Sequence, residues 1–253
     1  MELLFEDQAK EFISRLPDIN GVDPPATHLM MLAIRSRFAR ELMGFKVHDL
    51  VTERKIVRPV PDWRKRYFDK LYNLAILRQE AKYIVKDVEA PMECKALFAT
   101  ICPRNVRMAN SDTMKWMVDS LMLYANDEGV RHNLTKVEVK YFGFLHSRRH
   151  PESPKYVTLD VDDISVYDEV LDRASPFKKF MITKTARGKH IVLDLGNRQA
   201  AKDFFENGGV WEKMAIDLGK KAVELLKDPQ EPIPGTFYFN GNKDKPNYVE
   251  IIE

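Results

Sequence analysis

The chain has 253 residues, a formal net charge of +2, 44% hydrophobic residues and 31% charged residues. This size and composition allow a substantial buried core, and the near-neutral charge excludes a protein that binds nucleic acid through an overall basic surface. The two cysteines, Cys94 and Cys102, exclude a disulfide framework and are too few for a structural zinc site without histidines.

The chain shows no targeting or membrane signal. Its first residues, MELLFEDQAKEF, are acidic and amphipathic, which differs from a signal peptide, and its apolar runs are shorter than a membrane span. We therefore expect a cytoplasmic protein with no membrane partner.

The N-terminal third of the chain reads as helices. Apolar residues at three- and four-residue spacing predict helices over 2–15, 26–43 and about 62–86. Between the last two, the prolines of ERKIVRPVP (53–61) predict an extended connector. We therefore expect a helical N-terminal region over residues 1–90.

Strands and helices alternate in the remaining residues, 91–253. Strands are predicted for CKALFATIC (94–102), TKVEVKYFGFLH (135–146), KYVTLDV (155–161), KKFMITKT (178–185) and KHIVLDL (189–195). Helices are predicted for SDTMKWMVDSLMLYAND (111–127), SVYDEVLDRA (165–174), RQAAKDFFEN (198–207) and VWEKMAIDLGKKAVELLK (210–227), and the methionine-rich stripe of the first of these is predicted to be core. Strands outside a simple βαβ alternation predict an α+β domain with a mostly antiparallel sheet.

Three carboxylates end the apolar run KYVTLDVDD. Residues two apart on a strand project from the same face, so Asp160 and Asp162 point together. Two such oxygen donors suit a hard divalent cation, Mg²⁺ or Mn²⁺, which shares its remaining sites with water and substrate phosphates. A solvated strand end without a metal is the alternative.

A tight basic turn, TARGKH, follows at 185–190. Thr185 offers a hydroxyl, Arg187 a positive charge and His190 an imidazole, while Gly188 lets the backbone approach a ligand closely. Such a turn suits the phosphates of a nucleotide. The alternative is a basic hairpin with a surface histidine.

Four segments in this order resemble motifs of the archaeo-eukaryotic primase superfamily, which includes primase small subunits, primase-polymerases and bacterial end-joining polymerases. LDVD resembles its h-D-h-D/E motif, and TARGKH resembles S-G-R-G-x-H with threonine in place of serine. IPGTFYFNG (233–241) is similar to a later P-G-S/T segment, and LFATICPRNVRMAN (97–110) is similar to an upstream strand followed by N-P-R. The resemblance covers roughly residues 94–252.

The resemblance implies a primase-polymerase catalytic domain over residues 91–253 with an RRM-like core. Asp160 and Asp162 would bind the catalytic metal ions. His190 would bind the phosphates of the incoming nucleotide together with Thr185, Arg187 and Gly188. A third metal-binding acid is implied, for which we favour Asp228 over Asp194. With so few cysteines, the zinc insertion of cellular primases is absent, which favours a compact viral or mobile-element type.

The implied reaction is metal-dependent, template-directed nucleotidyl transfer by a DNA primase or primase-polymerase that makes or extends primers in DNA replication. Its expected ligands are single-stranded DNA, NTPs or dNTPs, and Mg²⁺ or Mn²⁺, and a replicative helicase is a further expected partner. Arg104, Arg148 and Arg149 are the predicted template contacts.

Two alternatives remain open. One is a catalytically weak, primase-like DNA-binding subunit of the replication machinery. The other is an unrelated Asp-x-Asp enzyme such as a nucleotide-sugar transferase, although such enzymes usually begin with a Rossmann-like half.

Overall fold

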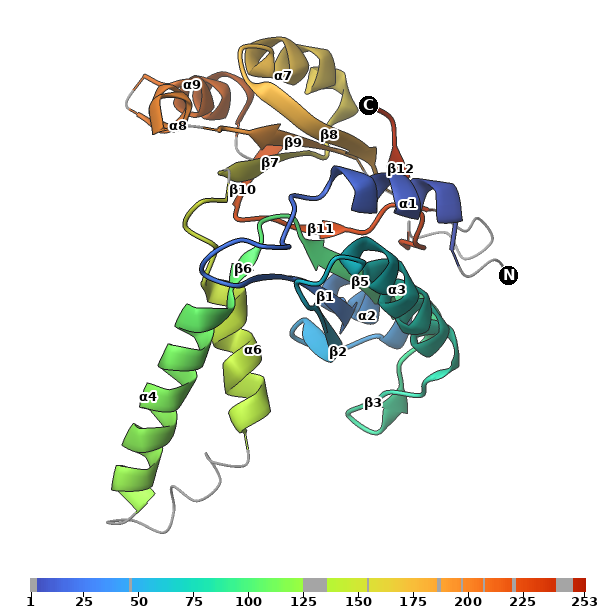
Figure 1. Ribbon diagram of the computed structural model, residues 1–253. Coiled ribbons are helices and arrows are strands. Elements are labelled where there is room, and N and C mark those ends of the chain that lie inside the picture. The colour runs from blue at the N-terminus through green and yellow to red at the C-terminus, as the bar shows by residue number, and fades with distance from the viewer. Residues whose placement is uncertain are drawn as a thin grey trace.

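The computed structural model describes residues 4–45, 47–124, 136–153, 155–185, 188–196, 198–206, 208–219, 222–239 and 248–253. Two antiparallel five-stranded sheets organise these residues, and helices cover both of them (Figure 1). No helix in this part of the chain is long and apolar enough to cross a membrane.

The first sheet, here the N-terminal sheet, is built around strand β1. Its strand order is β11 (Gln230–Pro232), β5 (Lys95–Thr100), β1 (Ala26–Ile34) and β2 (Leu50–Val57), and β6 (Arg104–Asn105) also pairs with β1. All nine residues of β1 are buried. The strand is therefore covered on both faces, as a central strand must be.

The second sheet, here the C-terminal sheet, has a βαββαβ core. Its strand order is β10 (Val223–Lys227), β7 (Tyr156–Val161), β9 (Lys189–Asp194), β8 (Lys178–Lys184) and β12 (Glu250–Ile251). Helix α7 (Tyr167–Ala174) connects β7 to β8, and helices α8 (Arg198–Phe205) and α9 (Val210–Met214) lie between β9 and β10 in the chain. These helices cover the outer face of the sheet (Figure 1). The first four strands of this order form a split βαβ arrangement.

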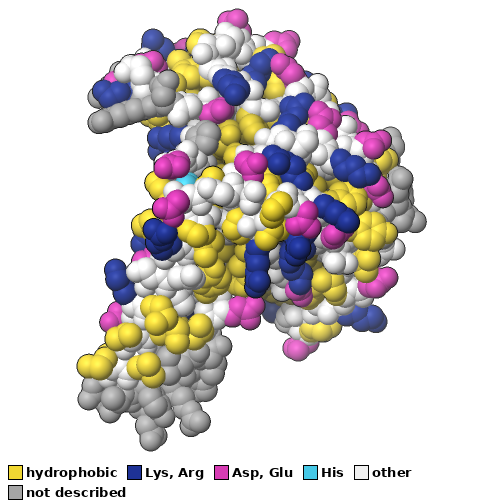
Figure 2. All heavy atoms as spheres, viewed as in Figure 1, with side chains coloured by type: hydrophobic (Ala, Val, Ile, Leu, Met, Phe, Trp, Pro, Cys, Tyr) yellow, Lys and Arg dark blue, Asp and Glu magenta, His cyan; other side chains and the backbone are white. Residues whose placement is uncertain are grey.

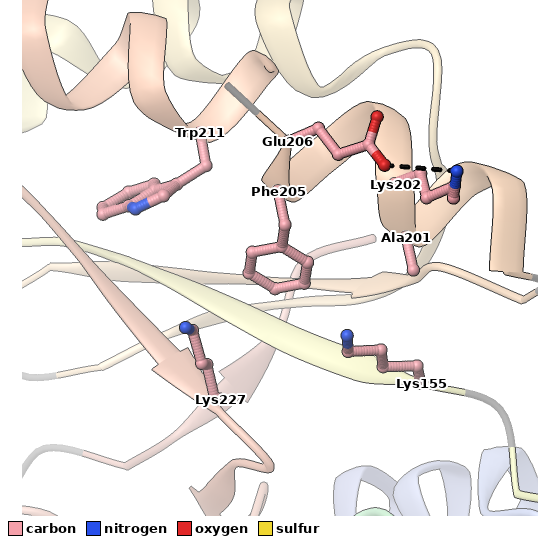
Figure 3. Close-up of a pocket in the computed structure, with 7 residues that line it drawn as sticks. All are labelled: Lys155, Ala201, Lys202, Phe205, Glu206, Trp211 and Lys227. Atoms are coloured by element: carbon pink, nitrogen blue, oxygen red, sulfur yellow. Dashed lines mark ion pairs between the residues drawn. The ribbon is translucent and has the colours of Figure 1, made fainter. Parts of the chain in front are cut away.

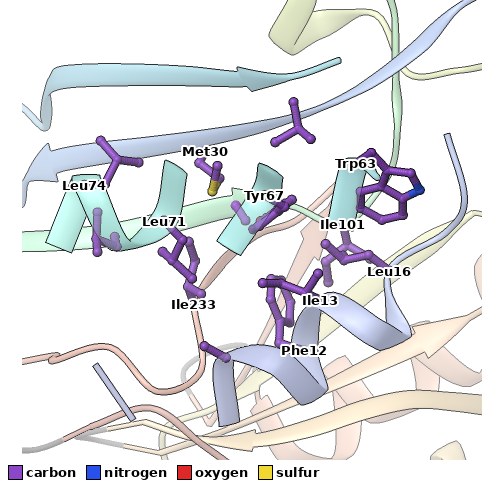
Figure 4. Packing of buried hydrophobic residues seen from close by; sticks show 14 of the residues in the cluster. Phe12, Ile13, Leu16, Met30, Trp63, Tyr67, Leu71, Leu74, Ile101 and Ile233 are labelled. Atoms are coloured by element: carbon purple, nitrogen blue, oxygen red, sulfur yellow. The ribbon is translucent and has the colours of Figure 1, made fainter. Parts of the chain in front are cut away.

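A shared apolar core joins the two sheets. Helix α3 (Trp63–Glu80) packs onto the N-terminal sheet, and helix α1 (Glu6–Arg15) packs against α3, through buried rings and aliphatic side chains (Figure 4). Tyr156, Met181 and Val192 of the C-terminal sheet belong to the same cluster. The sheets therefore face each other across one core.

A helical arm projects from this body. Helices α4 (Val106–Tyr124) and α6 (Val137–Ser147) pack against each other and extend away from the sheets (Figure 1). Hydrophobic side chains are visible on the surface of the arm (Figure 2). The exposed hydrophobic residues of α4 include Met114, Val118, Leu121 and Met122. The prediction that this stripe is core is therefore wrong.

The remaining elements are short. They are α2 (Ser36–Met43), the hairpin β3 (Ile84–Val85) with β4 (Val88–Glu89), two 3₁₀ turns at Met92–Cys94 and Ile164–Val166, and a π-helical turn at Ala215–Gly219.

The predicted α+β class and the predominance of antiparallel pairing are confirmed. The helix predicted over 26–43 is wrong for its first half, which is β1, and β2 occupies much of the expected connector. A strand buried on both faces is a continuous apolar run, which periodicity cannot separate from a buried helix. Residues 1–90 are therefore not wholly helical, and β1 pairs across the expected boundary with β5.

Two other predicted elements change type. The strand predicted over 135–146 is largely helix α6, which packs against α4 and in which Leu145 is buried. The helix predicted over 210–227 stops at Gly219, whose φ of +81° is left-handed, and its last residues form β10 beside β7. Tertiary pairing decided both cases.

Removing a buried side chain from β1 should cost more stability than removing the same side chain from the edge strand β2. Leu32 is fully buried, so Leu32→Ala should lower the free energy of unfolding by about 2–5 kcal/mol. Leu50 is 46% exposed, and Leu50→Ala should change it by no more than about 0.5 kcal/mol. Urea denaturation followed by circular dichroism measures both, and equal losses would contradict the central position of β1.

Candidate active site

Three polar side chains form a row across the C-terminal sheet. Asp160 on β7 lies directly opposite Glu224 on β10 and directly opposite His190 on β9. Opposite residues of antiparallel strands project from the same face, so the two carboxylates and the imidazole share one face. Their strand neighbours Leu159 and Val223 are buried on the other face, under the helices. Strand alternation thus puts the row on the side of the sheet away from α7.

This row lines a cleft with a volume of about 470 Å³. Asp162, which follows the end of β7, is exposed and lines the same cleft. Arg35 and Arg37 reach the cleft from the corner between β1 and α2, so the N-terminal sheet supplies its second wall. The structure therefore brings Asp160, Asp162 and His190 together, as the motifs predict, and adds Glu224 and two arginines.

The turn between β8 and β9 is held tightly against the end of β7. A Cβ atom on Gly188 would lie 2.2 Å from the backbone oxygen of Val161, so this approach requires glycine. Thr185 is buried, and its hydroxyl accepts a 3.3 Å hydrogen bond from the Gly188 N–H. Neither residue is among the described residues that line the cleft, and Arg187 lies outside the described residues. In this structure Thr185 and Gly188 hold the turn against the strand end that precedes Asp162.

His190 is held between two carboxylates. Its Nδ1 atom lies 2.6 Å from Oε2 of Glu231, and its Nε2 atom lies 3.3 Å from Oδ1 of Asp160. Glu231 is fully buried on β11, in the N-terminal sheet, and also accepts a hydrogen bond from the Thr158 hydroxyl on β7. The imidazole is thus fixed on both sides, by one acid from each sheet.

The two acids favour the imidazolium form of His190. Burial by itself would lower the pKa of His190, but the charge of Glu231 and the hydrogen bond to Asp160 raise it well above its ordinary value. Burial works against the charge of Asp160 as well, yet the hydrogen bond and charge of His190, and then Arg37 and Arg35, lower the pKa of Asp160. The cleft therefore pairs a carboxylate with an imidazolium at neutral pH.

Glu231 was not predicted from the sequence. Its segment, KDPQEPIPG, also contains Asp228, the predicted third acid, and a glutamate between prolines carries no periodic signal. Its role depends on β11 crossing to the other sheet, which no local pattern records.

Asp228, the favoured third acid, is placed in the turn between β10 and β11 with a left-handed φ of +59°. Its Oδ2 atom accepts a hydrogen bond from Nη1 of Arg104 at 2.5 Å. It lines the cleft, and its Oδ2 atom is held by this arginine, while its Oδ1 atom has no hydrogen-bond partner within the described residues.

Asp194, the competing choice, lies away from the row. It pairs with Tyr156 in the sheet, four residues along β9 from His190, which corresponds to about 13 Å along a strand. Its carboxylate accepts a hydrogen bond from the Gly196 N–H at 2.8 Å and lies 3.8 Å from Lys178. Glu224 is the acid that the sheet places beside Asp160. Glu224 was not predicted as a site residue, because VELLK (223–227) continues the apolar spacing of the helix predicted over 210–227.

The predicted template contacts fall into two groups. Arg104 is fully buried and donates to the His146 carbonyl at 2.8 Å as well as to Asp228, so a surface contact with a template is not open to it. The side chain of Arg148 is 42% exposed and binds Asp112, and Arg149 is partly exposed beside β6. These two remain accessible.

The arginines of the second wall are also partly held. Arg35 lies 3.1 Å from Asp49 and covers the ring of Phe98, and Arg37 donates to the Tyr238 hydroxyl at 2.8 Å. In each, the buried Nε atom has no partner within the described residues. Neither arginine was predicted as a site residue, because the segment IRSRF (34–38) lies in the middle of the helix predicted over 26–43.

The carboxylates of the cleft fit a hard divalent cation better than a softer one. Within the described residues, no group of three or more His, Cys, Asp or Glu side chains is closed around one point. Asp160, Asp162 and Glu224 nevertheless line one space with oxygen donors only. Mg²⁺ usually takes one or two carboxylates and completes its shell with water and phosphate, so an open set of this kind fits it.

No family model matches this chain, and the searches of curated proteins and of solved structures also found no match. The chemistry of the cleft therefore follows from the side chains that line it.

Replacing His190 by Gln should destabilise the protein more at pH 6 than at pH 9. Because the folded pKa of His190 is raised, its stabilisation is complete below the unfolded value, about 6.5, and is lost as the pH rises through the folded value. Urea denaturation at both pH values measures this difference. His48→Gln, at an exposed histidine, is the control, and an effect of His190→Gln that does not change with pH would contradict the imidazolium assignment.

Replacing Asp228 by Asn should destabilise the fold, because the buried Arg104 would lose its carboxylate partner. We expect a loss of about 1–3 kcal/mol in the free energy of unfolding. Asparagine tolerates the left-handed backbone, so the variant tests the charge alone. Asp87→Asn is the matched control, since Asp87 is exposed and has a φ of +65°. Equal stability of the two variants would show that the Arg104 pair contributes nothing.

Proposed function

We propose that this protein is a metal-dependent, template-directed nucleotidyltransferase of the primase type, which makes or extends primers on single-stranded DNA from NTPs or dNTPs. The observation that carries the proposal is the single cleft shared by Asp160, Asp162 and His190. These are the residues that the archaeo-eukaryotic primase motifs single out in this sequence.

The fold of the C-terminal sheet supports the same proposal. Its βαββαβ order, with neighbouring strands β10, β7, β9 and β8 all antiparallel, is that of an RRM-like core. The acids end the first strand of this core, and the histidine lies on the strand beside it. An RRM-like core bearing acids and a histidine in this arrangement is what the resemblance implies.

Asp160, Asp162 and Glu224 are the residues that would hold the metal. When bound, Mg²⁺ or Mn²⁺ would stabilise the charge on the attacking and leaving oxygens of nucleotidyl transfer. We assign the third acid to Glu224, because it lies opposite Asp160 in the sheet while Asp228 is bound to Arg104 and Asp194 lies outside the cleft. This assignment replaces Asp228.

The cationic groups of the cleft suit the phosphates of an incoming nucleotide. His190 carries a proton on the Nε2 atom that faces Asp160, and Glu231 holds the ring in this orientation. Arg37 contributes a guanidinium from the second wall. Fixed cations on both sides of an anionic ligand orient it and stabilise charge that develops on its oxygens.

Neutralising a metal-binding carboxylate should abolish nucleotide incorporation while leaving the template bound. We expect Asp160→Asn, Asp162→Asn and Glu224→Gln each to lower the rate by at least about a thousandfold, since a metal ligand contributes several kcal/mol to the transition state. The measurement is Mg²⁺- or Mn²⁺-dependent incorporation of labelled nucleotides on single-stranded DNA, with and without a primer. Asp194→Asn is the matched control and should keep near-wild-type activity.

The outcomes separate the alternatives. A wild-type protein that binds template but incorporates nothing with either metal would be the catalytically weak replication subunit. If Glu224→Gln is fully active and a folded Asp228→Asn is inactive, the third metal-binding acid is Asp228 and not Glu224.

A further inference from the structure

A second hollow lies on the other face of the C-terminal sheet, next to the active-site cleft (Figure 3). It has a volume of about 520 Å³ and is lined by two aromatic rings, Phe205 of α8 and Trp211 of α9, together with three lysines: Lys155, Lys202 and Lys227. Aromatic rings interleaved with cations are the usual composition of surfaces that bind single-stranded nucleic acid.

Lys155 and Lys227 approach the same ring. Their Nζ atoms lie 4.4 Å and 5.1 Å from the centroid of Phe205. In the sheet, Lys227 is opposite Val157 and Lys155 is two residues before Val157, so both project from the same face. The pairing of the strands therefore brings these two cations together.

Two of the three lysines have no acidic partner among the described residues. Lys202 is 3.3 Å from Glu206, but neither Lys155 nor Lys227 forms an ion pair within the described residues. Burial lowers the pKa of Lys155, and the positive charges of Arg149 and Lys227 lower it further. Glu206, the acid that lines the hollow, pairs with Lys202, so Lys155 and Lys227 repel each other, and a bound anion would relieve that repulsion.

The hollow and the active-site cleft share a lining residue. Lys227 lines both the hollow and the cleft that contains Asp160. It ends β10, the edge strand of the C-terminal sheet, so a ligand can pass around this edge from one face to the other. Arg149, a residue expected from the sequence to bind template, lies close enough to act on the charge of Lys155.

We propose that this hollow binds a segment of single-stranded nucleic acid that leads into the active-site cleft. A backbone phosphate lies between Lys155 and Lys227, and the adjoining base stacks on Trp211. The identification of this nucleic acid as the DNA template rests on the proposed function. The binding of a single strand in the hollow is inferred from the lysines and aromatic rings that line it.

The test measures binding of a fluorescein-labelled oligothymidylate of ten nucleotides by anisotropy at several salt concentrations. Lys155→Gln with Lys227→Gln should weaken binding about tenfold and reduce the slope of log K against log salt by about 0.7, since the phosphate that the two lysines share contributes about 0.7 in a single strand. Trp211→Leu should weaken binding by about tenfold through lost stacking and leave the slope unchanged.

The matched control removes the same charge elsewhere. Lys115→Gln with Lys136→Gln, at two exposed lysines of the α4–α6 arm, should leave affinity and slope as in the wild type. If both double variants bind the oligonucleotide equally well, the hollow is not on the path of the strand and the proposal is overturned.

Two further arms identify the ligand. In a Trp116→Phe background, the oligonucleotide should quench the fluorescence of Trp211, since Trp63 is buried. Free dTTP at the same concentration of phosphate should not. Equal quenching by dTTP would assign the hollow to a mononucleotide and overturn the proposal.

The variant Asp160→Asn separates this inference from the proposed function. It should lose incorporation yet bind the oligonucleotide with an unchanged dependence on Lys155 and Lys227. If the wild type lacks incorporation but shows this dependence, the proposed function fails and the strand-binding hollow stands. If incorporation is normal and this dependence is absent, the hollow fails and the function stands.

Discussion

The contact between Glu231 and His190 is the constraint on which the rest of the structure depends. Glu231 is fully buried in the N-terminal sheet, and its partners, His190 and Thr158, belong to the C-terminal sheet. A buried carboxylate without a partner is strongly destabilising, so the two sheets must dock in the register that brings these groups together. The register in which the two sheets dock is therefore also the register that assembles the cleft.

The crossing between the sheets is made by a very short stretch of chain. β10 ends at Lys227 and β11 begins at Gln230, so the chain leaves one sheet and joins the other within residues 228–229. Asp228 turns the backbone with its left-handed φ and anchors it to the buried Arg104. Glu224 lies on one wall of the cleft before this turn, and Glu231 lies behind His190 after it. Asp228, predicted from the sequence as a metal ligand, holds the turn that connects the two strands.

Charge is distributed around the C-terminal sheet in a way that suits an anionic chain ligand. Acids occupy the middle of the cleft, Arg35 and Arg37 face them from the second wall, and Lys155 and Lys227 lie on the opposite face of the sheet. A metal would be held by the first group and phosphates by the other two. The near-neutral net charge of the chain conceals this separation, because it averages over all three.

The sequence by itself determined the features that depend on neighbours along the chain. Alternation on one strand put Asp160 and Asp162 on one side, and the turn before His190 placed that residue on the next strand. Glu224 and Glu231 could not be found in this way, since their roles arise from pairing with strands far away in sequence. For the same reason, β1 was wrongly predicted as a helix and the apolar stripe on α4 was wrongly predicted as core. Local periodicity reports which face of an element is apolar, whereas only the tertiary structure decides which element covers that face and which charges meet across it.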